Sequence, residues 1–134
     1  MCHNEAMTIA EAPKRVLTRL EEERNIWMAT TRPDGRPHLT PIWFIWHNSL
    51  IYICVKPTSV KARNLAKNPA TALSLEDGSD VVICEGTAEL MPAPWSAELK
   101  AKFKAKYDWD IDTDKEYGHV LAITPKKWLS WSPD

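Results

Sequence analysis

The stretch ATTRPDGRPHLTPIWF (residues 29–44) contains a tight turn between two runs of β-forming residues. Its centre, Arg32-Pro33-Asp34-Gly35, has the x-Pro-Asp-Gly pattern of a turn that joins two antiparallel strands. We therefore expect one strand over residues 25–31 and a longer second strand over residues 36–46. This hairpin predicts an antiparallel sheet, because parallel strands need a long crossover between them.

The second strand of this hairpin carries Pro37 and Pro41. Proline has no N–H to donate to a ladder, so this strand must be bulged or must leave part of one side unpaired. Unpaired backbone N–H and C=O groups could recognise the edge of a flat heteroaromatic ring, and Trp43 and Phe44 could wall that ring. A core strand with ordinary aromatic packing explains the same pattern equally well.

The rest of the chain continues as short elements separated by turns. We expect further strands over residues 50–55, 70–75, 80–91, 119–124 and 126–131. The total is about seven strands with three helices between them. This pattern predicts a mainly β fold, a six- to seven-stranded antiparallel split β-barrel with flanking helices. A length of 134 residues predicts a single domain over residues 1–134.

Three segments carry helix signals. Thr8 and Glu11 fit a capping box, and Pro13 suits the first turn of a helix that ends near residue 24. Thr58 or Ser59 is expected to cap a second helix over residues 60–67. A third helix is expected over residues 95–106, and the acidic residues 108–114 after it predict a solvated loop.

Composition and residue spacing argue against several classes of protein. Cysteines 2, 54 and 84 are widely spaced without a CxxC pair, which indicates reduced thiols in a cytoplasmic protein. The sequence shows no apolar run long enough for a membrane span and no secretory signal. The histidines lack the spacing of metal ligands, so no metal site is expected. A net charge of −1 and a pI near 6.4 argue against binding to nucleic acid.

Charge is nevertheless distributed unevenly. Between Asp34 and Glu76 there is no acidic residue, while five cations occur at positions 36, 56, 61, 63 and 67. Ser59 and Lys61 would lie at a helix N-terminus, which favours anions, and Lys56 approaches from the preceding strand. The segment therefore predicts a phosphate-sized site, although a capped surface helix with solvated lysines gives the same pattern.

No motif for acid–base, nucleophilic or P-loop chemistry occurs in the sequence. If the protein is an enzyme, the reactive group is expected to be a bound cofactor, and the protein supplies binding and orientation. We therefore name no catalytic residue.

Four segments in order resemble the flavin-binding split-barrel family that includes pyridoxamine 5′-phosphate oxidase. They are residues 29–44, 59–75, 85–90 (EGTAEL) and 123–131 (ITPKKWLSW). The resemblance implies a homodimer with FMN at the subunit interface and an oxidoreductase that transfers hydride between the flavin and a small flat or hydrophobic substrate. The oxidase branch carries an Arg/Lys-rich strand where this chain has HLTPIW, so oxidation of pyridoxamine phosphate itself is not expected. The segment PHLTPIWF is closer to the corresponding segment of short reductase-like members, some of which bind a deazaflavin coenzyme in place of FMN.

The resemblance also implies which residues bind the cofactor. The second strand would lie along the isoalloxazine and ribityl chain, the segment around the second helix would hold the phosphate, and a tryptophan near the C-terminus, Trp128 or Trp131, would contact the ring from the other subunit. The expected set is His38, Thr40, Pro41, Ile42, Trp43, Val55, Lys56, Ser59, Val60, Lys61 and Trp131.

A non-enzymatic flavin or haem carrier on the same barrel remains an alternative. Haem would need an axial ligand, and His3, His47 and His119 are the candidates. Nothing in the sequence selects one of them.

Overall fold

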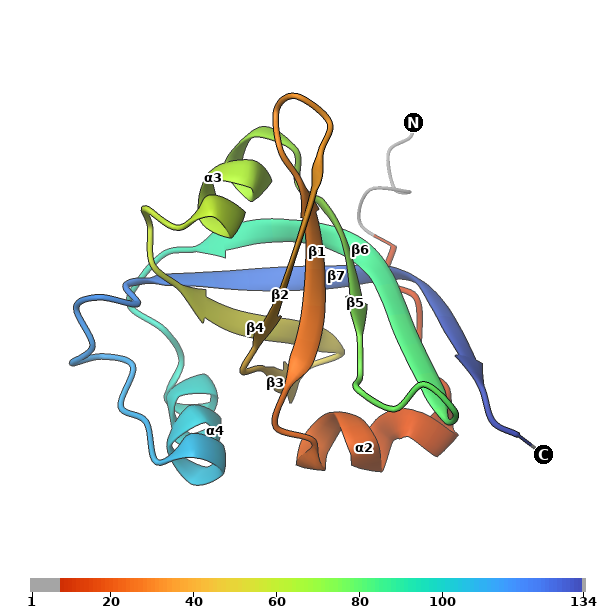
Figure 1. Ribbon diagram of the computed structural model, residues 1–134. Helices are drawn as coiled ribbons and strands as arrows, with labels where there is room; N and C mark the ends of the chain where they lie inside the picture. Colours follow the sequence, from red (N-terminus) through yellow and green to blue (C-terminus); the bar gives the residue numbers. More distant parts are fainter. Residues whose placement is uncertain (1–7, 134) are drawn as a thin grey trace.

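The computed structural model describes residues 8–133 and shows a mainly β protein (Figure 1). Seven strands form one antiparallel sheet in the order β2-β1-β5-β6-β7-β4-β3. Their bounds are β1 Ile26–Thr31, β2 Pro37–Ile42, β3 Ile45–His47, β4 Leu50–Val55, β5 Ala70–Ser74, β6 Val81–Met91 and β7 His119–Trp131.

The two edges of this sheet are strands that follow one another in the chain. β2 and β3 lie at opposite ends of the strand order, yet only Trp43 and Phe44 connect them. The sheet must therefore curl until its edges approach, as Figure 1 shows. In the described part of the chain β2 pairs only with β1, and β3 covers only the first half of β4. The barrel thus stays split between β2 and residues 53–55 of β4, and the predicted split-barrel class is confirmed.

Two strand predictions need correction. The long second strand is broken after Ile42, because the chain must leave one sheet edge and join the other at β3. The two strands expected at the C-terminus are instead the single strand β7, which pairs with β6 from Val120 to Trp131. Its register shifts between Glu85 and Gly86, opposite Pro125. A bulge absorbs the proline there, so the strand continues where the sequence suggested a break.

The N-terminal helix starts later than predicted, and the capping box is wrong. The 3₁₀ turn η1 (Lys14–Val16) leads into α2 (Leu17–Glu22), and Pro13 stands at the helix start without a side-chain capping bond. Residues before it are extended, since the N–H of Ala10 donates to the carbonyl of Pro125. Val16 and Leu20 are fully buried, so this helix closes one end of the barrel.

Two further helices flank the split. In α3 (Val60–Lys67), Ser59 is the N-cap and its Oγ accepts from the N–H of Ala62 at 3.2 Å, as predicted. α4 (Ala97–Tyr107) begins two residues later than expected, because Ser96 provides its cap. Within residues 8–133, no helix has the length and apolar character needed to cross a membrane.

The apolar side chains form two clusters, one on each face of the sheet. The inner cluster fills the barrel and includes Leu20 of α2 and Leu65 of α3. The outer cluster packs α4, through Leu99 and Phe103, against the outer face of β3, β4 and β7. This second cluster places α4 and the residues that follow it beside the split.

Candidate functional site

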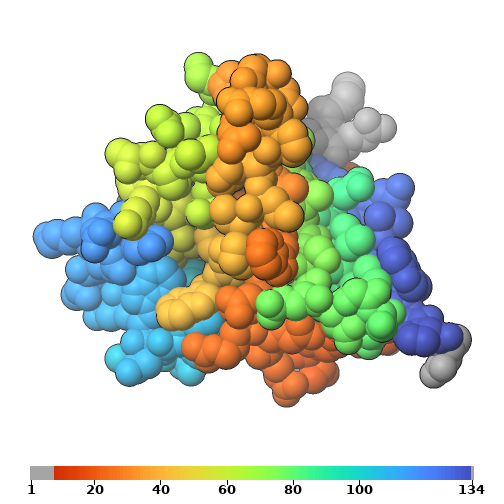
Figure 2. All heavy atoms as spheres, viewed as in Figure 1, coloured from red at the N-terminus to blue at the C-terminus, as the bar shows by residue number. Residues whose placement is uncertain are grey.

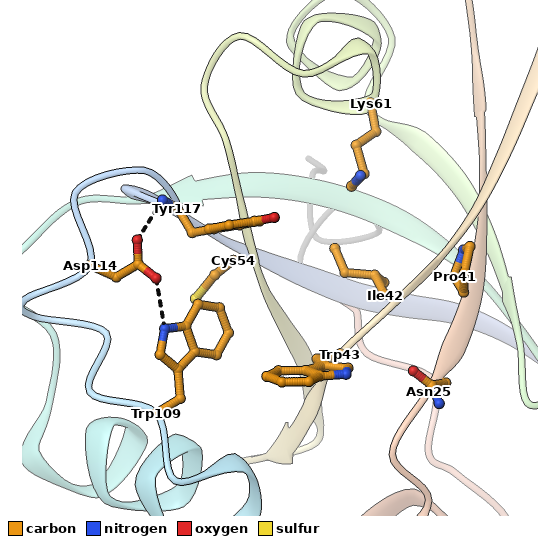
Figure 3. A pocket seen from close by; sticks show the side chains of 9 residues that line it. All are labelled: Asn25, Pro41, Ile42, Trp43, Cys54, Lys61, Trp109, Asp114 and Tyr117. Carbon is orange, nitrogen blue, oxygen red and sulfur yellow. Dashed lines mark hydrogen bonds between the residues drawn. The ribbon is translucent and has the colours of Figure 1, made fainter.

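A pocket of about 430 Å³ opens at the split of the barrel. This volume is within the range of sites for small molecules and cofactors. The lining residues come from both sides of the split, as Figure 3 shows: Pro41, Ile42 and Trp43 at the end of β2, Lys61 of α3, Cys54 of β4, Trp109, Asp114 and Tyr117 of the loop after α4, and Asn25. Figure 2 shows the same side of the molecule, with the orange β1–β2 hairpin to the right of the yellow-green α3 and of the blue loop below it.

The free edge of β2 forms one side of this pocket. Residues Pro37–Ile42 pair with β1 alone, so the backbone groups that point away from β1 have no strand partner in the described part of the chain. His38, Thr40 and Ile42 alternate toward the barrel interior. His38 Nδ1 and Thr40 Oγ1 are buried without a hydrogen-bond partner. Because such groups are normally satisfied in folded proteins, these two atoms are available to a hydrogen-bonding partner that enters beside β2.

Lys61 points from the first turn of α3 into the pocket, toward Ile42 (Figure 3). Within residues 8–133 no carboxylate pairs with its ammonium group. Burial lowers the pKa of Lys61, and burial together with the charges of Arg32 and Lys61 lowers the pKa of His38. A half-buried cation without a counter-ion, next to the free N–H groups of a helix N-terminus, is suited to an anion.

Trp43 forms the aromatic floor of the pocket. Its ring is stacked on Tyr107, with 4.4 Å between the ring centroids, and the guanidinium of Arg24 lies 4.8 Å from the Tyr107 ring. The Tyr107 hydroxyl accepts from the N–H of Phe44 at 3.0 Å and donates to the carbonyl of Arg24 at 2.7 Å. Phe44, which the sequence placed beside a ligand ring, is instead fully buried in the inner cluster.

Residues 108–118, here called the aromatic loop, form the opposite wall. The sequence reading of this stretch as a solvated acidic loop missed Trp109, Asp114 and Tyr117, which all line the pocket. The alternation of aspartates with Trp109, Ile111 and Tyr117 was the available signal. Ile111 is 2% exposed, so the loop is anchored in the outer cluster.

Not all of the predicted phosphate-site residues lie at this pocket. Val55 is fully buried in β4. Lys56 is not among the lining residues, and its Nζ lies 3.5 Å from Glu116 and 5.3 Å from the Tyr117 ring centroid. Val60 faces away, into a second hollow of about 510 Å³ on the other side of α3. This basic hollow is lined by Arg32, Arg36, Arg63 and Lys67, with Pro33, Asp34 and Asn64.

The two C-terminal tryptophans have different surroundings. The indole N–H of Trp128 donates to the carbonyl of Ala10 at 3.0 Å, and its ring packs edge-on against Trp46. Trp131 lies at the end of β7, paired with Val81 and 54% exposed, outside the pocket of its own chain. Of the two, only Trp131 therefore offers a largely open ring surface.

The described thiols are unreactive, and neither His47 nor His119 lies at this pocket. Burial raises the pKa of Cys54 and of Cys84 to about 12, so both stay protonated. His47 is buried against Tyr52 and His119 lines a small groove beside α3, while His3 lies outside the described residues. Among residues 8–133 no group of three or more His, Cys, Asp or Glu side chains gathers to hold a metal ion.

Solved structures of other proteins share this fold. A protein described as an F420 reductase is 24% identical, with a TM-score of 0.73, over 88% of this chain and 98% of that chain. The haem storage protein HutZ from Vibrio cholerae is 16% identical, with a TM-score of 0.74, over 87% and 93% of the two chains. General stress protein 26 from Bacillus anthracis is 22% identical, with a TM-score of 0.67, over 88% and 97%.

A comparison at the level of sequence identifies the family of this chain. None of the curated proteins matches this chain significantly. The family model described as pyridoxamine 5′-phosphate oxidase, however, matches residues 12–132, which include the split barrel and every described residue of the pocket. The chain therefore belongs to the pyridoxamine 5′-phosphate oxidase family.

Proposed function

We propose that the protein binds FMN in the pocket at the barrel split and acts as a flavin-dependent oxidoreductase. The observation that carries this proposal is the pairing of two unsatisfied features across one pocket. One is the free edge of β2, which lines the pocket at Pro41 and Ile42 and carries the buried orphan atoms of His38 and Thr40 further along the strand, outside the pocket lining. The other is the half-buried Lys61 at the start of α3. A planar ring with an anionic tail satisfies both.

In this proposal each element has one task. The N-terminus of α3, with Ser59 and Lys61, binds the phosphate through backbone N–H groups and one charge. The free edge of β2 at Pro41–Trp43 binds the ring edge, and Trp43 excludes water from one side. When bound, the flavin supplies the hydride-transfer chemistry, which needs no protein base. The residues therefore bind and orient, in agreement with the lack of a catalytic motif.

We also propose a homodimer in which Trp131 of one chain completes the site of the other. Its ring is 54% exposed and lies away from its own pocket. Trp27 and Leu39, 37% and 61% exposed, lie on the outer face of the β1–β2 hairpin, where the register places Ala29 opposite Leu39. Exposed apolar side chains gathered on one face favour a protein partner.

A deazaflavin coenzyme is the second candidate, and the basic hollow favours it. This hollow gathers Arg63 and Lys67 of α3 with Arg36 of the hairpin, next to the proposed phosphate site. The longer anionic tail of a deazaflavin would be suited to these cations. The similarity to an F420 reductase supports this candidate. A haem carrier has less support, because no described histidine lines the pocket.

The test is the absorption spectrum and the mass of the small molecule that copurifies, followed by titration of the ligand-free chain with FMN. FMN in the purified protein supports the first candidate and a deazaflavin supports the second. Lys61→Ala is expected to weaken FMN binding by roughly tenfold or more, because it removes a charge-assisted hydrogen bond. The control is Lys67→Ala, on the same helix but in the basic hollow.

Equal effects of the two substitutions would place the phosphate elsewhere. A chain that binds neither FMN nor a deazaflavin would overturn the proposed function.

A further inference from the structure

The carboxylate of Asp114 ties together two aromatic residues of the aromatic loop (Figure 3). Its Oδ2 accepts from the indole N–H of Trp109 at 2.9 Å, and its Oδ1 accepts from the backbone N–H groups of Glu116 and Tyr117, both at 3.0 Å. These hydrogen bonds, from the backbone of Tyr117 first and then from Trp109, lower the pKa of Asp114. The carboxylate is thus held ionised between Trp109 and Tyr117.

The rings that Asp114 orders form a continuous aromatic wall with Trp43. Trp109 packs edge-on against Trp43, with 5.7 Å between centroids, and against Tyr117, with 5.9 Å. Trp109 is also fixed from behind by Phe103 of α4, at 5.7 Å. Trp43 and Tyr117 remain 42% and 38% exposed. Large aromatic surfaces left open inside a pocket are typical of a ligand contact.

The loop part of this wall, Trp109 and Tyr117, faces β2 across the pocket. In the proposed function the free edge of β2 and Lys61 hold the cofactor, so the aromatic loop borders the remaining space. The positions where a cationic ligand would bind on this wall are already used. Lys56 already lies over the Tyr117 ring and pairs with Glu116, and both oxygens of Asp114 already accept hydrogen bonds.

We propose that the aromatic loop is the substrate-binding wall, and that Asp114 is the positioning residue that orders Trp109 and Tyr117 for a flat aromatic substrate that is uncharged or anionic. This inference rests on the proposed function, which sets the position of the cofactor. It adds the wall of the pocket where the substrate binds and the chemical class of that substrate. Asp114 acts through its neighbours and does not itself touch the substrate. Stacking on rings that are already fixed costs little ordering entropy.

The test uses Asp114→Asn, which keeps the size of the side chain. Whichever way the amide turns, its NH₂ faces either the indole N–H of Trp109 or the backbone N–H groups, so one set of bonds is lost. Trp109→Phe removes the same indole bond from the other side. Asp112→Asn is the matched control, because Asp112 lies in the same loop but pairs with the exposed Lys100.

Two readouts apply to each variant with and without FMN. One is near-ultraviolet circular dichroism, and the other is the apparent Kd of menadione, a flat uncharged probe, from quenching of tryptophan emission. Asp114→Asn is expected to reduce the aromatic dichroism and to raise the menadione Kd roughly three- to tenfold, with unchanged FMN affinity. Asp112→Asn should change neither. Asp114→Asn added to Trp109→Phe should add little, since both remove one interaction.

The inference is overturned if Asp114→Asn leaves the dichroism and the menadione Kd unchanged. It is also overturned if the variant weakens FMN as much as menadione, because the loop would then contact the cofactor. Tighter binding of phenyltrimethylammonium than of menadione would refute the substrate class. If the chain binds no flavin, the proposed function fails, whereas the measurements on the flavin-free chain still decide the role of Asp114.

Discussion

The ring of Trp43 lies parallel to the ring of Tyr107, with 4.4 Å between the centroids and 6° between the planes. This contact joins the crossover between β2 and β3 to the last residue of α4. The hydroxyl of Tyr107 also bonds the backbone of Phe44, so one side chain fixes both the path of the crossover and the floor of the pocket.

Tyr107→Phe is therefore expected to lower the free energy of unfolding by about 1–3 kcal/mol, because it leaves the buried N–H of Phe44 without its partner. Urea denaturation measures this loss, and near-ultraviolet dichroism should report a less ordered Trp43. Tyr117→Phe is the control, since its ring is 38% exposed at the pocket rim. Equal stability of Tyr107→Phe and the wild type would mean that stacking alone positions the crossover.

The partly buried ammonium group of Lys106 is expected to make the stability of the fold depend on pH. Its Nζ donates to the carbonyl of Phe44 at 3.0 Å, and burial lowers its pKa to about 8. Between pH 8 and the usual lysine pKa of 10.5, the unfolded chain binds a proton that the folded chain does not. The free energy of unfolding contributed by this group therefore rises with pH in this window.

Lys106→Met isolates the contribution of this lysine. The stability of the wild type relative to the variant should increase from pH 7.5 to about pH 9.5, below the range where tyrosines titrate. Thermal or urea unfolding of both chains across this range gives the difference. A difference that stays constant, or that falls as pH rises, would contradict a lowered pKa of Lys106.

Most of the fold could be predicted because its signals are local. The hairpin turn at Asp34-Gly35, the run of β-forming residues in β4 and the cap at Ser59 each depend on neighbouring residues. The corrections concern features set by distant partners. Pro125 is typical of a strand end, yet β7 continues through it because Lys126 is bulged out of the ladder, between the pairs Gly86–Pro125 and Glu85–Lys127. No local pattern in residues 119–131 contains that information.

Gly86 provides a test of the close contact between β6 and β7 at this point. A Cβ at this position would collide with the backbone carbonyl oxygen of Thr124, whereas a Cβ at Gly78 would meet nothing within 4 Å. Gly86→Ala is expected to cost about 1–3 kcal/mol of the free energy of unfolding through overpacking, while Gly78→Ala should be nearly neutral. Equal urea midpoints for the two variants would show that the strands separate without cost.

The candidate site was half predictable for the same reason. Pro41, Ile42, Trp43 and Lys61, which the sequence analysis named, line the pocket, because the proline pattern and the helix start can be recognised in the sequence. Trp109, Asp114 and Tyr117 reach the pocket only because α4 packs on the outer face of the sheet through Leu99 and Phe103. That packing is a tertiary contact, and the aspartates around these residues suggested solvent instead.

A substitution at Thr40 distinguishes a contribution to stability from a contribution to cofactor binding. Its Oγ1 is buried without a partner, one row from Ile42 in the strand that borders the pocket. Thr40→Val keeps the shape of the side chain and removes the unsatisfied group, so the ligand-free chain should be as stable as the wild type or more stable. FMN affinity, in contrast, should fall about threefold or more if the hydroxyl serves the cofactor. Urea unfolding of the ligand-free chain and FMN titration together decide the point: a variant that loses stability yet binds FMN normally would make Thr40 a structural residue and remove it from the proposed site.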